Sequence, residues 1–508
     1  MATPTPRRDL RLLGVVCAWL FVGVVWSLAI PPLEAPDETA HVDMVRHIVD
    51  ERGYPRDPIT VDVATVSARA WVLGLADGRR FTDVVPPRAD RPSFADLTTD
   101  ATFDAPNQMV QHPPLGYAHL VAAEALIRVA PGDPAFDLHL WLLRLTTLAL
   151  GTAIPVLIAR AVRALRGSPT QALVGALLPL TIPQLAASLG TVGNDVPLVV
   201  AAAAAAVAAA RLVTDRRRSG TALGVAIGLG ALTKGFGLAL FVLPVVTLLD
   251  RPRRWSPVAA GVASGIAAWW WIWNVARFGS VQTHGVPLEA LYGAPLEHGP
   301  GFTDWLTRAG PRLVDRFWGA FGSFSLHIGL PRWATLSASL AMVVLAARGV
   351  ARGGAAARPF ACAHGLLLIG SLAVLTWGAF DLFTTYGVLL GVQGRYLFAV
   401  VPGVAVLVGL GVGRQSTRAA PATLLAIAGI QAFALWRVLD GWWGRPDDDP
   451  VERLRAMAGW CPVPPALVGV LLGALLLSGS VCLLRSRPDD PDPAKGAPVA
   501  ATATLLSP

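Results

Sequence analysis

Long apolar segments dominate the chain and are separated by polar connections, most of them short. A transmembrane helix needs about 20 predominantly apolar residues. Segments of this length, or close to it, occur at about 12–30, 138–159, 170–190, 196–213, 221–249, 257–275, 333–347, 360–379, 396–412, 419–436 and 464–484. The segment 221–249 is too long for one straight span, and Thr233-Lys234-Gly235 interrupts its middle, so we expect two short helices that meet at Lys234. The pattern predicts an all-α polytopic membrane protein with about twelve transmembrane helices.

The distribution of arginine supports this count, because short cytoplasmic loops collect positive charge. Arginine clusters fall at every second boundary if the segment 221–249 crosses twice and the apolar run 115–130 does not cross. The clusters are Arg7, Arg8 and Arg11; Arg160, Arg163 and Arg166; Arg211, Arg216, Arg217 and Arg218; Arg251, Arg253 and Arg254; Arg348, Arg352 and Arg358; Arg414 and Arg418; and Arg485 and Arg487. Both termini are then predicted to be cytoplasmic.

Three longer loops are predicted on the other side of the membrane, at 31–137, 276–332 and 437–463. The first contains nine Arg, no Lys and 17 Asp or Glu, so it is acidic where the cytoplasmic loops are basic. A loop of about 100 residues is too long for a simple connector. We expect a small extracytoplasmic lobe with helices at about 38–52 and 113–130 lying along the membrane surface. The chain is thus predicted to form a single membrane-embedded domain, 1–485, followed by a disordered cytoplasmic tail, 486–508.

Composition excludes several classes of protein. Hydrophobic residues make up 54% of the 508 residues and charged residues only 15%, against about 25% in soluble globular proteins. The net charge of +8 does not indicate nucleic-acid binding, because the positive charges are spread over many connections and share no face. The lipid bilayer is the expected partner. All basic residues except Lys234 and Lys495 are arginine, a bias that together with abundant Ala and Gly is typical of a GC-rich bacterial genome and predicts a bacterial plasma membrane.

The best-defined polar motif follows the first apolar segment and reads Pro36-Asp37-Glu38-Thr39-Ala40-His41. Pro36 can open a helix, and the i, i+4 spacing then places Asp37 and His41 on one face. This arrangement fits a general base at the outer membrane surface, with His41 orienting it or contacting substrate. A solvated, capped helix start fits the same residues, and both interpretations remain open at this point.

Further polar residues precede or interrupt the apolar segments. His112 stands before Pro113-Pro114, where it fits either a phosphate contact or a loop-to-helix turn, and Asn194-Asp195 occupies a short outer turn. Arg144 and Lys234 lie within apolar surroundings, where an unpaired charge costs on the order of 3 kcal/mol or more. They therefore predict either a water-filled cavity or a structural ion pair.

Two motifs on the outer side are also unusual for a membrane protein of this topology. Gln393-Gly394-Arg395-Tyr396 places a positive charge against the topology rule, so an anionic partner such as a lipid phosphate is plausible. The segment from Arg316 to Gly322 is rich in aromatic residues, and Trp318 taken alone is typical of an interfacial belt.

Taken together, these motifs resemble a known class of membrane enzymes. In chain order they are Pro36-Asp37-Glu38-Thr39-Ala40-His41, His112-Pro113-Pro114-Leu115, Arg144-Leu145, Asn194-Asp195-Val196-Pro197-Leu198, Leu232-Thr233-Lys234-Gly235, Phe317-Trp318-Gly319-Ala320-Phe321-Gly322 and Gln393-Gly394-Arg395-Tyr396. Their order and common side resemble the GT-C class of membrane glycosyltransferases, in the branch that contains protein O-mannosyltransferases and the lipid A aminoarabinose transferase. The first and the last two motifs resemble more closely a bacterial family of predicted membrane proteins called domain of unknown function 2142. The resemblance covers about residues 12–415.

The resemblance implies a GT-C-like bundle and a set of site residues. Asp37 or Glu38 would be the catalytic base, Asp195 the second catalytic acid, and Lys234 and Arg395 the cations that hold the donor phosphate. The predicted substrate-binding residues are His41, His112, Arg144, Asn194, Lys234, Gln393, Arg395 and Tyr396. One departure concerns His112, which stands where the aminoarabinose transferase has Lys before Pro-Pro-Leu.

The implied function is an inverting glycosyltransferase with its active site on the outer face of the membrane. Its donor would be a polyprenyl-phosphate-linked sugar and its acceptor an extracytoplasmic glycan, lipid or protein of the cell envelope. The alternatives are a transporter or flippase of a polysaccharide pathway and a non-catalytic assembly protein. A transporter is expected to have repeated halves and paired helix breaks, whereas the sequence has one break, at Lys234. No cofactor is expected, and no tightly bound metal, because Asp37, Glu38 and His41 lack Asp-x-Asp spacing.

Overall fold

The computed structural model describes residues 10–55, 57–98, 105–214, 219–247, 255–281, 288–322 and 328–484. In these ranges the regular elements are α-helices and short 3₁₀ helices, and extended pairing is confined to isolated bridges. The tail predicted at 486–508 and the arginine clusters at 216–218 and 251–254 lie outside the described residues. The prediction of an all-helical protein is confirmed.

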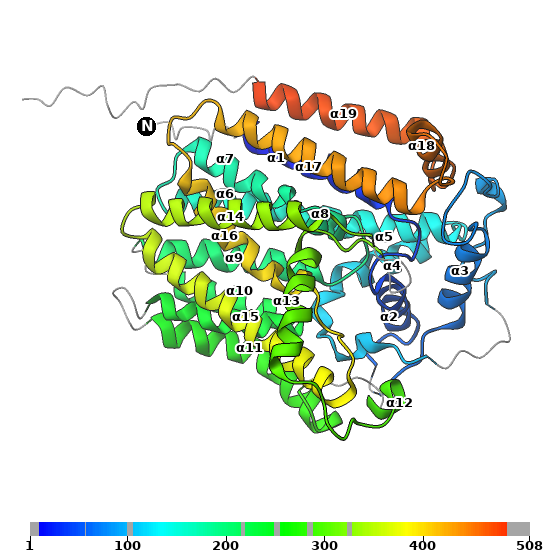
Figure 1. Ribbon diagram of the computed structural model, residues 1–508, viewed down its shortest axis with the longest axis horizontal. Helices are drawn as coiled ribbons and strands as arrows, with labels where there is room; N and C mark the ends of the chain where they lie inside the picture. The colour runs from blue at the N-terminus through cyan, green and yellow to red at the C-terminus, as the bar shows by residue number, and fades with distance from the viewer. Residues whose placement is uncertain are drawn as a thin grey trace, which may run out of the picture.

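Nine helices or helix pairs in the described ranges are long and apolar enough to cross a membrane. They are α1 (Leu10–Ala29), α5 with α6 (Phe136–Gly151, Ala153–Ala164), α9 (Asp195–Leu212), α11 (Trp255–Phe278), α14 (Arg332–Arg352), α15 (Ala357–Tyr386), η6 with α16 (Gly394–Val400, Val401–Gly411), α17 (Ala419–Trp442) and α19 (Pro465–Leu484). The chain is a multi-pass membrane protein, and the helices run side by side in one bundle (Figure 1).

The remaining apolar segments are also helical but are short or bent. One is built from α7 (Pro169–Leu177), η4 (Leu178–Thr181) and α8 (Pro183–Leu189), and it bends by 85° where Pro183 removes a backbone donor. The long segment 221–249 divides into α10 (Ser219–Ala231) and η5 (Gly235–Thr247), so the predicted break at Lys234 is present. The count of twelve spans is not established, because nine helices qualify by length and composition, or ten with the bent pair.

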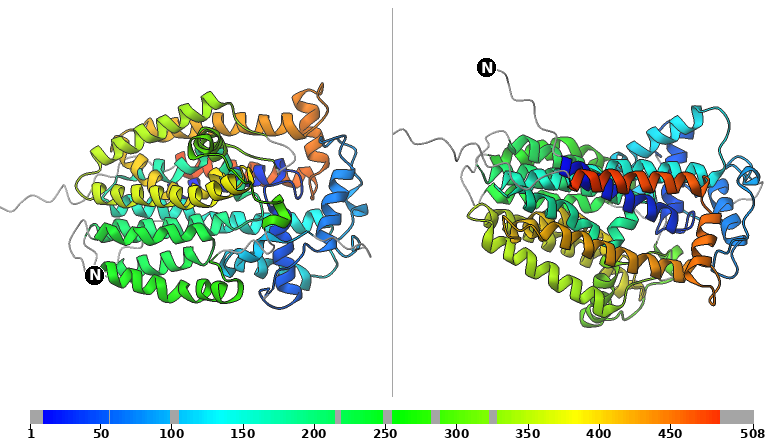
Figure 2. Two further views of the ribbon diagram at one scale, coloured as in Figure 1. Left: turned by 60° about the horizontal axis from the view of Figure 1, so that its bottom comes forward. Right: turned by 90° about the horizontal axis from the view of Figure 1, so that it is seen from above.

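The first outer loop folds into a lobe at one end of the bundle (Figures 1 and 2). It contains α2 (Glu38–Asp50), α3 (Val63–Gly74) and α4 (Ala118–Val129), with short 3₁₀ turns at Arg88–Asp90, Gln108–Gln111 and Pro114–Gly116. The helices predicted at about 38–52 and 113–130 are found as α2 and α4, whereas α3 was not predicted. The shorter helices α12 (Leu288–Tyr292), α13 (Phe302–Trp318) and α18 (Pro450–Gly459) belong to the other two outer loops.

Buried polar contacts attach this lobe to the helix bundle. Arg91 pairs with Asp137 at the start of α5 and also donates to the carbonyl of Gly459 at 2.7 Å, which joins the first loop to α18. Glu124 of α4 is fully buried and accepts from His139 of α5 at 2.5 Å. A core of aromatic side chains that includes Trp26, Trp443 and Trp460 fills the space between the lobe and the bundle. The lobe is therefore fixed over the helix ends.

The opposite end of the bundle holds the start of α1, the end of α19, and the connections between α14 and α15 and between α16 and α17 (Figure 1). Those two connections and the adjoining helix ends carry the described clusters Arg348 to Arg358 and Arg414 to Arg418. Arginine-bearing connections and the lobe thus lie at opposite ends, as the charge pattern requires. Which end faces the cytoplasm, and the domain boundaries 1–485, remain predictions.

Candidate active site

Four charged side chains from distant segments meet beneath the lobe. Nζ of Lys234 donates to Oδ1 of Asp195 at 2.5 Å. Arg395 donates from Nη2 to Asp37, and its Nη1 lies 3.5 Å from Oδ2 of Asp195. The two acids and two cations form one chain of ion pairs in the order Asp37, Arg395, Asp195, Lys234, which we call the ion-pair chain.

Each member of the ion-pair chain stands at a helix end. Asp37 is the N-cap of α2, Asp195 is the first residue of α9, Lys234 lies between α10 and η5, and Arg395 is the second residue of η6. Asp37 has φ of +62°, in the left-handed region that side chains other than Gly, Asn and Asp seldom adopt. Arg395 also donates to the carbonyl of Pro36 at 3.3 Å, so it fixes this turn from both sides.

Asp37 is the most accessible member of the ion-pair chain. Its side chain is 25% exposed, whereas those of Arg395, Asp195 and Lys234 are each less than 10% exposed. Burial by itself would raise the pKa of Asp37, but the charge and hydrogen bond of Arg395, together with His41 and Lys234, outweigh it and hold the pKa below its ordinary value. Asp37 is therefore an ionised carboxylate that can be reached from outside.

Two histidines of the predicted site stand beside these charges in their neutral form. Nδ1 of His41 lies 2.9 Å from the hydroxyl of Tyr117, and the rings of His41 and His112 are stacked with centroids 6.3 Å apart. Burial, together with repulsion from Lys234 and Arg395, lowers the pKa of His41 to about 4 in spite of the attraction by Asp37 and Asp195. Burial also lowers the pKa of His112 well below its ordinary value. Neither ring carries a charge at neutral pH, so His112 offers no cation to a phosphate.

Asn194 is buried next to Asp195 without a hydrogen-bond partner. Its side chain is 0% exposed, and both Nδ2 and Oδ1 lack a partner among the described residues.

The loop before α4 packs directly on the Lys234 turn, since the backbone N–H of Leu115 donates to the carbonyl of Leu232 at 3.1 Å. A Cβ on Gly116 would lie only 2.5 Å from the carbonyl oxygen of Thr233, so only glycine permits this approach. The first outer loop and the turns that carry Asn194 and Lys234 are thereby brought together.

Tyr396 and Gln393 flank Arg395 on η6. The ring of Tyr396 stacks on Phe236 with centroids 4.3 Å apart, and Nζ of Lys234 lies 5.1 Å from the centre of the Tyr396 ring. Tyr396 therefore belongs to the same cluster. Gln393 is the half-buried N-cap of η6, and none of the hydrogen bonds found in the described residues joins its side chain to the four charges.

Glu38 and Arg144 form a separate buried ion pair, one of the two alternatives predicted for Arg144. Arg144 donates from Nε and Nη2 to the two carboxylate oxygens of Glu38 at 2.8 and 2.6 Å, and it also donates to three backbone carbonyls. Glu38 is 0% exposed and accepts in addition from the backbone N–H of Val192 at 3.0 Å. We infer that this pair is structural and ties α2 to α1 and α5. Of these two neighbouring acids only Asp37 has an exposed side chain, and Arg144 is paired with Glu38, whereas Lys234 is paired with Asp195.

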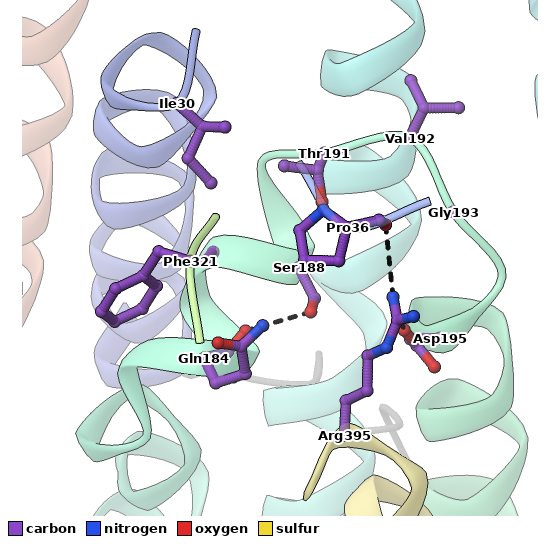
Figure 3. A pocket seen from close by; sticks show the side chains of 11 residues that line it. Ile30, Pro36, Gln184, Ser188, Thr191, Val192, Gly193, Asp195, Phe321 and Arg395 are labelled. Carbon is purple, nitrogen blue, oxygen red and sulfur yellow. Dashed lines mark hydrogen bonds and ion pairs between the residues drawn. The ribbon is translucent and has the colours of Figure 1, made fainter. Parts of the chain in front are cut away.

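A cleft opens beside the ion-pair chain (Figure 3). Its empty space is about 380 Å³ including the open side, and its lining includes Pro36, Asp195, Arg395, Gln184 and Phe321. The backbone N–H of Ala320 donates to Oε1 of Gln184 at 2.5 Å, which fixes the aromatic segment against α8. Gln184 was not predicted as a site residue. The signal available in the sequence was Pro183, which bends the chain so that α8 faces the cleft.

Arg316 is a third cation near the cleft that the sequence analysis assigned only to an aromatic segment. Its Nη1 donates to the carbonyl of Val392 at 3.0 Å, and burial with the charges of Arg312 and Arg395 lowers its pKa. No carboxylate pairs with it among the described residues. Gly394 lies so close to α13 that a Cβ would stand 2.0 Å from the backbone nitrogen of Phe317. This contact holds Arg316 and Arg395 on adjoining elements.

The described residues contain no group of three or more His, Cys, Asp or Glu side chains arranged to hold a metal ion.

The family described as "Predicted membrane protein (DUF2142)" matches residues 20–404 of the 508. The chain belongs to this family. The resemblance to domain of unknown function 2142 drawn from the motifs is thus confirmed.

Similar structures were also found for the DUF2142 protein. Crystal structures of ArnT from Cupriavidus metallidurans, in the apo state and bound to undecaprenyl phosphate, superpose with TM-scores of 0.49 and 0.48. Their sequence identities are 17% and 16%, and each alignment covers 92% of this chain and 74% of the ArnT chain. No curated protein matches the sequence.

Proposed function

We propose that this DUF2142 protein is a glycosyltransferase that moves a sugar from a polyprenyl-phosphate donor to a hydroxyl group outside the cytoplasm. The observation that carries the proposal is the ion-pair chain. Its four members, Asp37, Asp195, Lys234 and Arg395, come from separate outer turns and are the residues to which the GT-C resemblance assigns the acids and the phosphate-binding cations. A buried cluster of two acids and two cations fits a reaction that removes a proton and releases a phosphate.

Asp37 is proposed as the general base of a single displacement with inversion. The acceptor oxygen attacks the anomeric carbon while its proton passes to the carboxylate of Asp37, and the bond between that carbon and the donor phosphate oxygen breaks. General-base assistance of this kind contributes about 10²–10⁴-fold. The exposure of Asp37 and its ionised state both favour this role over Glu38, whose oxygens are all engaged.

The leaving polyprenyl phosphate gains negative charge, which fixed cations must stabilise. Lys234 and Arg395 are proposed for this task, with Arg316 as a third cation that approaches from α13. Preorganised charges in a site of low dielectric stabilise the developing charge without reorganisation. Because Lys234 and Arg395 are both neutralised by acids in the absence of donor, the phosphate first meets Arg316.

Donor binding is proposed to activate the base. The donor phosphate and the carboxylate of Asp37 compete for the same guanidinium group of Arg395. When the phosphate replaces the carboxylate, Asp37 becomes available to the acceptor hydroxyl, so the donor is expected to bind first. Asp195 keeps its contact with Lys234 in this scheme and positions the ammonium group.

The neutral groups around the charges are proposed to hold the sugar and the acceptor. His41 and Tyr117 form a hydrogen-bonded pair next to Asp37, and Asn194 offers both a donor and an acceptor that lack partners. Hydroxyl groups of a sugar can satisfy such atoms, and a buried polar atom without a partner costs about 1–3 kcal/mol. Tyr396 and Gln393 are proposed to contact the donor from η6.

The proposed location is a bacterial plasma membrane, with both termini in the cytoplasm and the active site on the outer face. The support is the position of the arginine clusters at 348–358 and 414–418, which lie at the end of the bundle opposite the acidic lobe. The acceptor would then be an envelope glycan, lipid or protein.

Purified protein in liposomes, supplied with polyprenyl phosphate carrying a radiolabelled sugar and with an envelope extract as acceptor, tests the function. Label that appears in an acceptor and free polyprenyl phosphate that accumulates in equal amount support the transferase. Label that crosses the bilayer still attached to the carrier supports transport instead. Label that stays on the carrier and on its original side rejects both activities.

A further inference from the structure

A second cleft lies behind the aromatic segment that lines the candidate active site. Residues 320 and 329 form an isolated antiparallel bridge, and the N–H of Phe321 donates to the carbonyl of Ile328 at 3.1 Å. Phe321 lines the cleft beside the ion-pair chain, whereas Ile328 lines the second cleft. This hydrogen-bonded pair thus contributes one residue to the lining of each cleft.

The second cleft is larger and its lining is mainly polar. Its empty space is about 720 Å³ including the open side, and it is lined by Asp77, Arg79, Arg80, Ile328, Arg437, Asp440 and Gly441. Residues 77–80 form a tight turn in the lobe, and Arg437 to Gly441 belong to the last turns of α17. A Cβ on Gly441 would lie 2.4 Å from Cδ1 of Ile328, so the missing side chain lets Ile328 pack against α17. The cleft thus opens at the end of the bundle that carries the lobe.

The charges of this cleft leave an excess of positive groups. Asp440 is already neutralised, because it accepts from Nη1 of Arg453 at 2.8 Å, and Arg453 is only 4% exposed and bonded to neighbouring carbonyls. Arg437 donates from Nε to the carbonyl of Gly329 at 3.3 Å and has no carboxylate partner in the described ranges. Nη1 of Arg80 is buried without a hydrogen-bond partner.

We propose that this cleft binds the phosphate group of an acceptor that also carries a hydroxyl group. The planar fork of a guanidinium group matches two phosphate oxygens, and the cleft is lined by Arg80 from the lobe turn and by Arg437 from α17. The identity of the ligand as acceptor rests on the proposed function, but the anion site itself does not. A ligand phosphate held by these arginines would place an attached hydroxyl next to the Phe321–Ile328 pair, of which Phe321 lines the cleft beside the ion-pair chain.

Two probes distinguish the possible sources of such a phosphate. For a soluble phosphate ester, glycerol 3-phosphate is titrated into the protein held in nanodiscs of phosphatidylcholine. For a lipid headgroup, the protein is reconstituted with phosphatidylglycerol, and the number of lipids that stay bound is measured by native mass spectrometry. The variants are Arg437→Gln, Arg80→Gln and the double variant, with Arg445→Gln as the matched control. Arg445 is exposed, follows α17 by three residues and does not line the cleft, so the control removes an equal charge.

The double variant is expected to lose one of the two ligands by about tenfold or more, while Arg445→Gln keeps it within about twofold. Loss of glycerol 3-phosphate binding identifies a soluble phosphate ester, and loss of phosphatidylglycerol identifies a lipid headgroup. Arg437→Lys, which keeps the charge, should retain part of the binding and guards against misfolding of the glutamine variants. Equal binding by the double variant and the control, or no saturable binding of either probe by the wild type, would overturn the proposal. A lack of sugar transfer would reject the proposed function without affecting these measurements.

Discussion

At the scale of single residues, the ion-pair chain determines which acid can react. Asp37 is partly exposed and is paired with Arg395. The carboxylate of Glu38, its neighbour in sequence, is buried and accepts hydrogen bonds from Arg144 and from the backbone N–H of Val192. Two adjacent carboxylates thus have different environments because one caps α2 and the other is the first residue within it.

The lowered pKa of Asp37 predicts the pH dependence of transfer. A carboxylate with a lowered pKa stays in its active, ionised form above that value, and activity is lost only as the pH falls through it. The pKa of an unperturbed Asp side chain is about 3.9, and that of Asp37 is lower. We therefore expect that the rate of transfer does not fall with decreasing pH between pH 7 and pH 5. Arg395→Gln removes the largest contribution that opposes burial, so the acid limb should move to higher pH. The pH profile of transfer by both proteins measures this, and a wild-type midpoint between pH 5 and 7 would refute it.

The Glu38–Arg144 pair predicts a strong effect on stability. Removing one partner leaves a buried charge unpaired, which typically costs about 3–5 kcal/mol. Arg144→Leu should therefore lower the thermal unfolding midpoint and the yield of folded protein in detergent. The double variant Glu38→Leu with Arg144→Leu removes both charges and should recover part of the loss. Equal stability of wild type and Arg144→Leu would contradict a structural role.

At the scale of elements, the apolar pattern predicted the positions of the spanning helices but not how they bend. Every predicted apolar segment contains helix in the described residues, and the break at Lys234 follows from a polar interruption in an overlong segment. The 85° bend before α8 was missed because an apolar segment containing Pro179 and Pro183 has the same hydropathy whether straight or bent. Helix α3 was missed because its apolar run is shorter than a span and lies within an acidic loop.

The contact between η6 and α13 predicts a site-specific effect of one methyl group. In Gly394→Ala the new Cβ would stand 2.0 Å from the backbone nitrogen of Phe317, so the two elements must separate and Arg395 must shift. A misplacement of about 1 Å can reduce catalysis on the order of 100-fold. Transfer and donor binding by this variant should fall accordingly. Gly365→Ala, in α15 with no atom within 4 Å of its Cβ, is the control and should behave as wild type.

At the scale of the whole molecule, the membrane orientation remains to be tested. The arginine pattern predicts that the C-terminus is cytoplasmic and that the lobe is outside. Green fluorescent protein fused to the C-terminus should be fluorescent and alkaline phosphatase fused there inactive, whereas phosphatase inserted at Gly132 should be active. Gly132 lies in an exposed turn of the first loop with open space around it. The reverse pattern of reporter activity would invert the topology and place the site in the cytoplasm.

The site was predictable from sequence only in part. Asp37, Asp195, Lys234 and Arg395 could be named because each is a polar residue at the same end of an apolar segment, and the structure brings all four together. The pairing of Arg144 with Glu38 could not be foreseen, since it depends on α5 passing beside the start of α2. The role of Gln184 depends in the same way on the orientation that the bend gives to α8.

The most direct test of the central claim compares the wild type with Asp37→Asn in one assay of donor binding and sugar transfer in nanodiscs. Transfer should fall by about 10²–10⁴-fold when the base is removed. Binding of polyprenyl phosphate should be retained or strengthened, because Arg395 no longer pairs with a carboxylate at position 37. Transfer by Asp37→Asn at close to the wild-type rate would contradict the assignment of Asp37, and loss of donor binding in that variant would contradict the proposed exchange at Arg395.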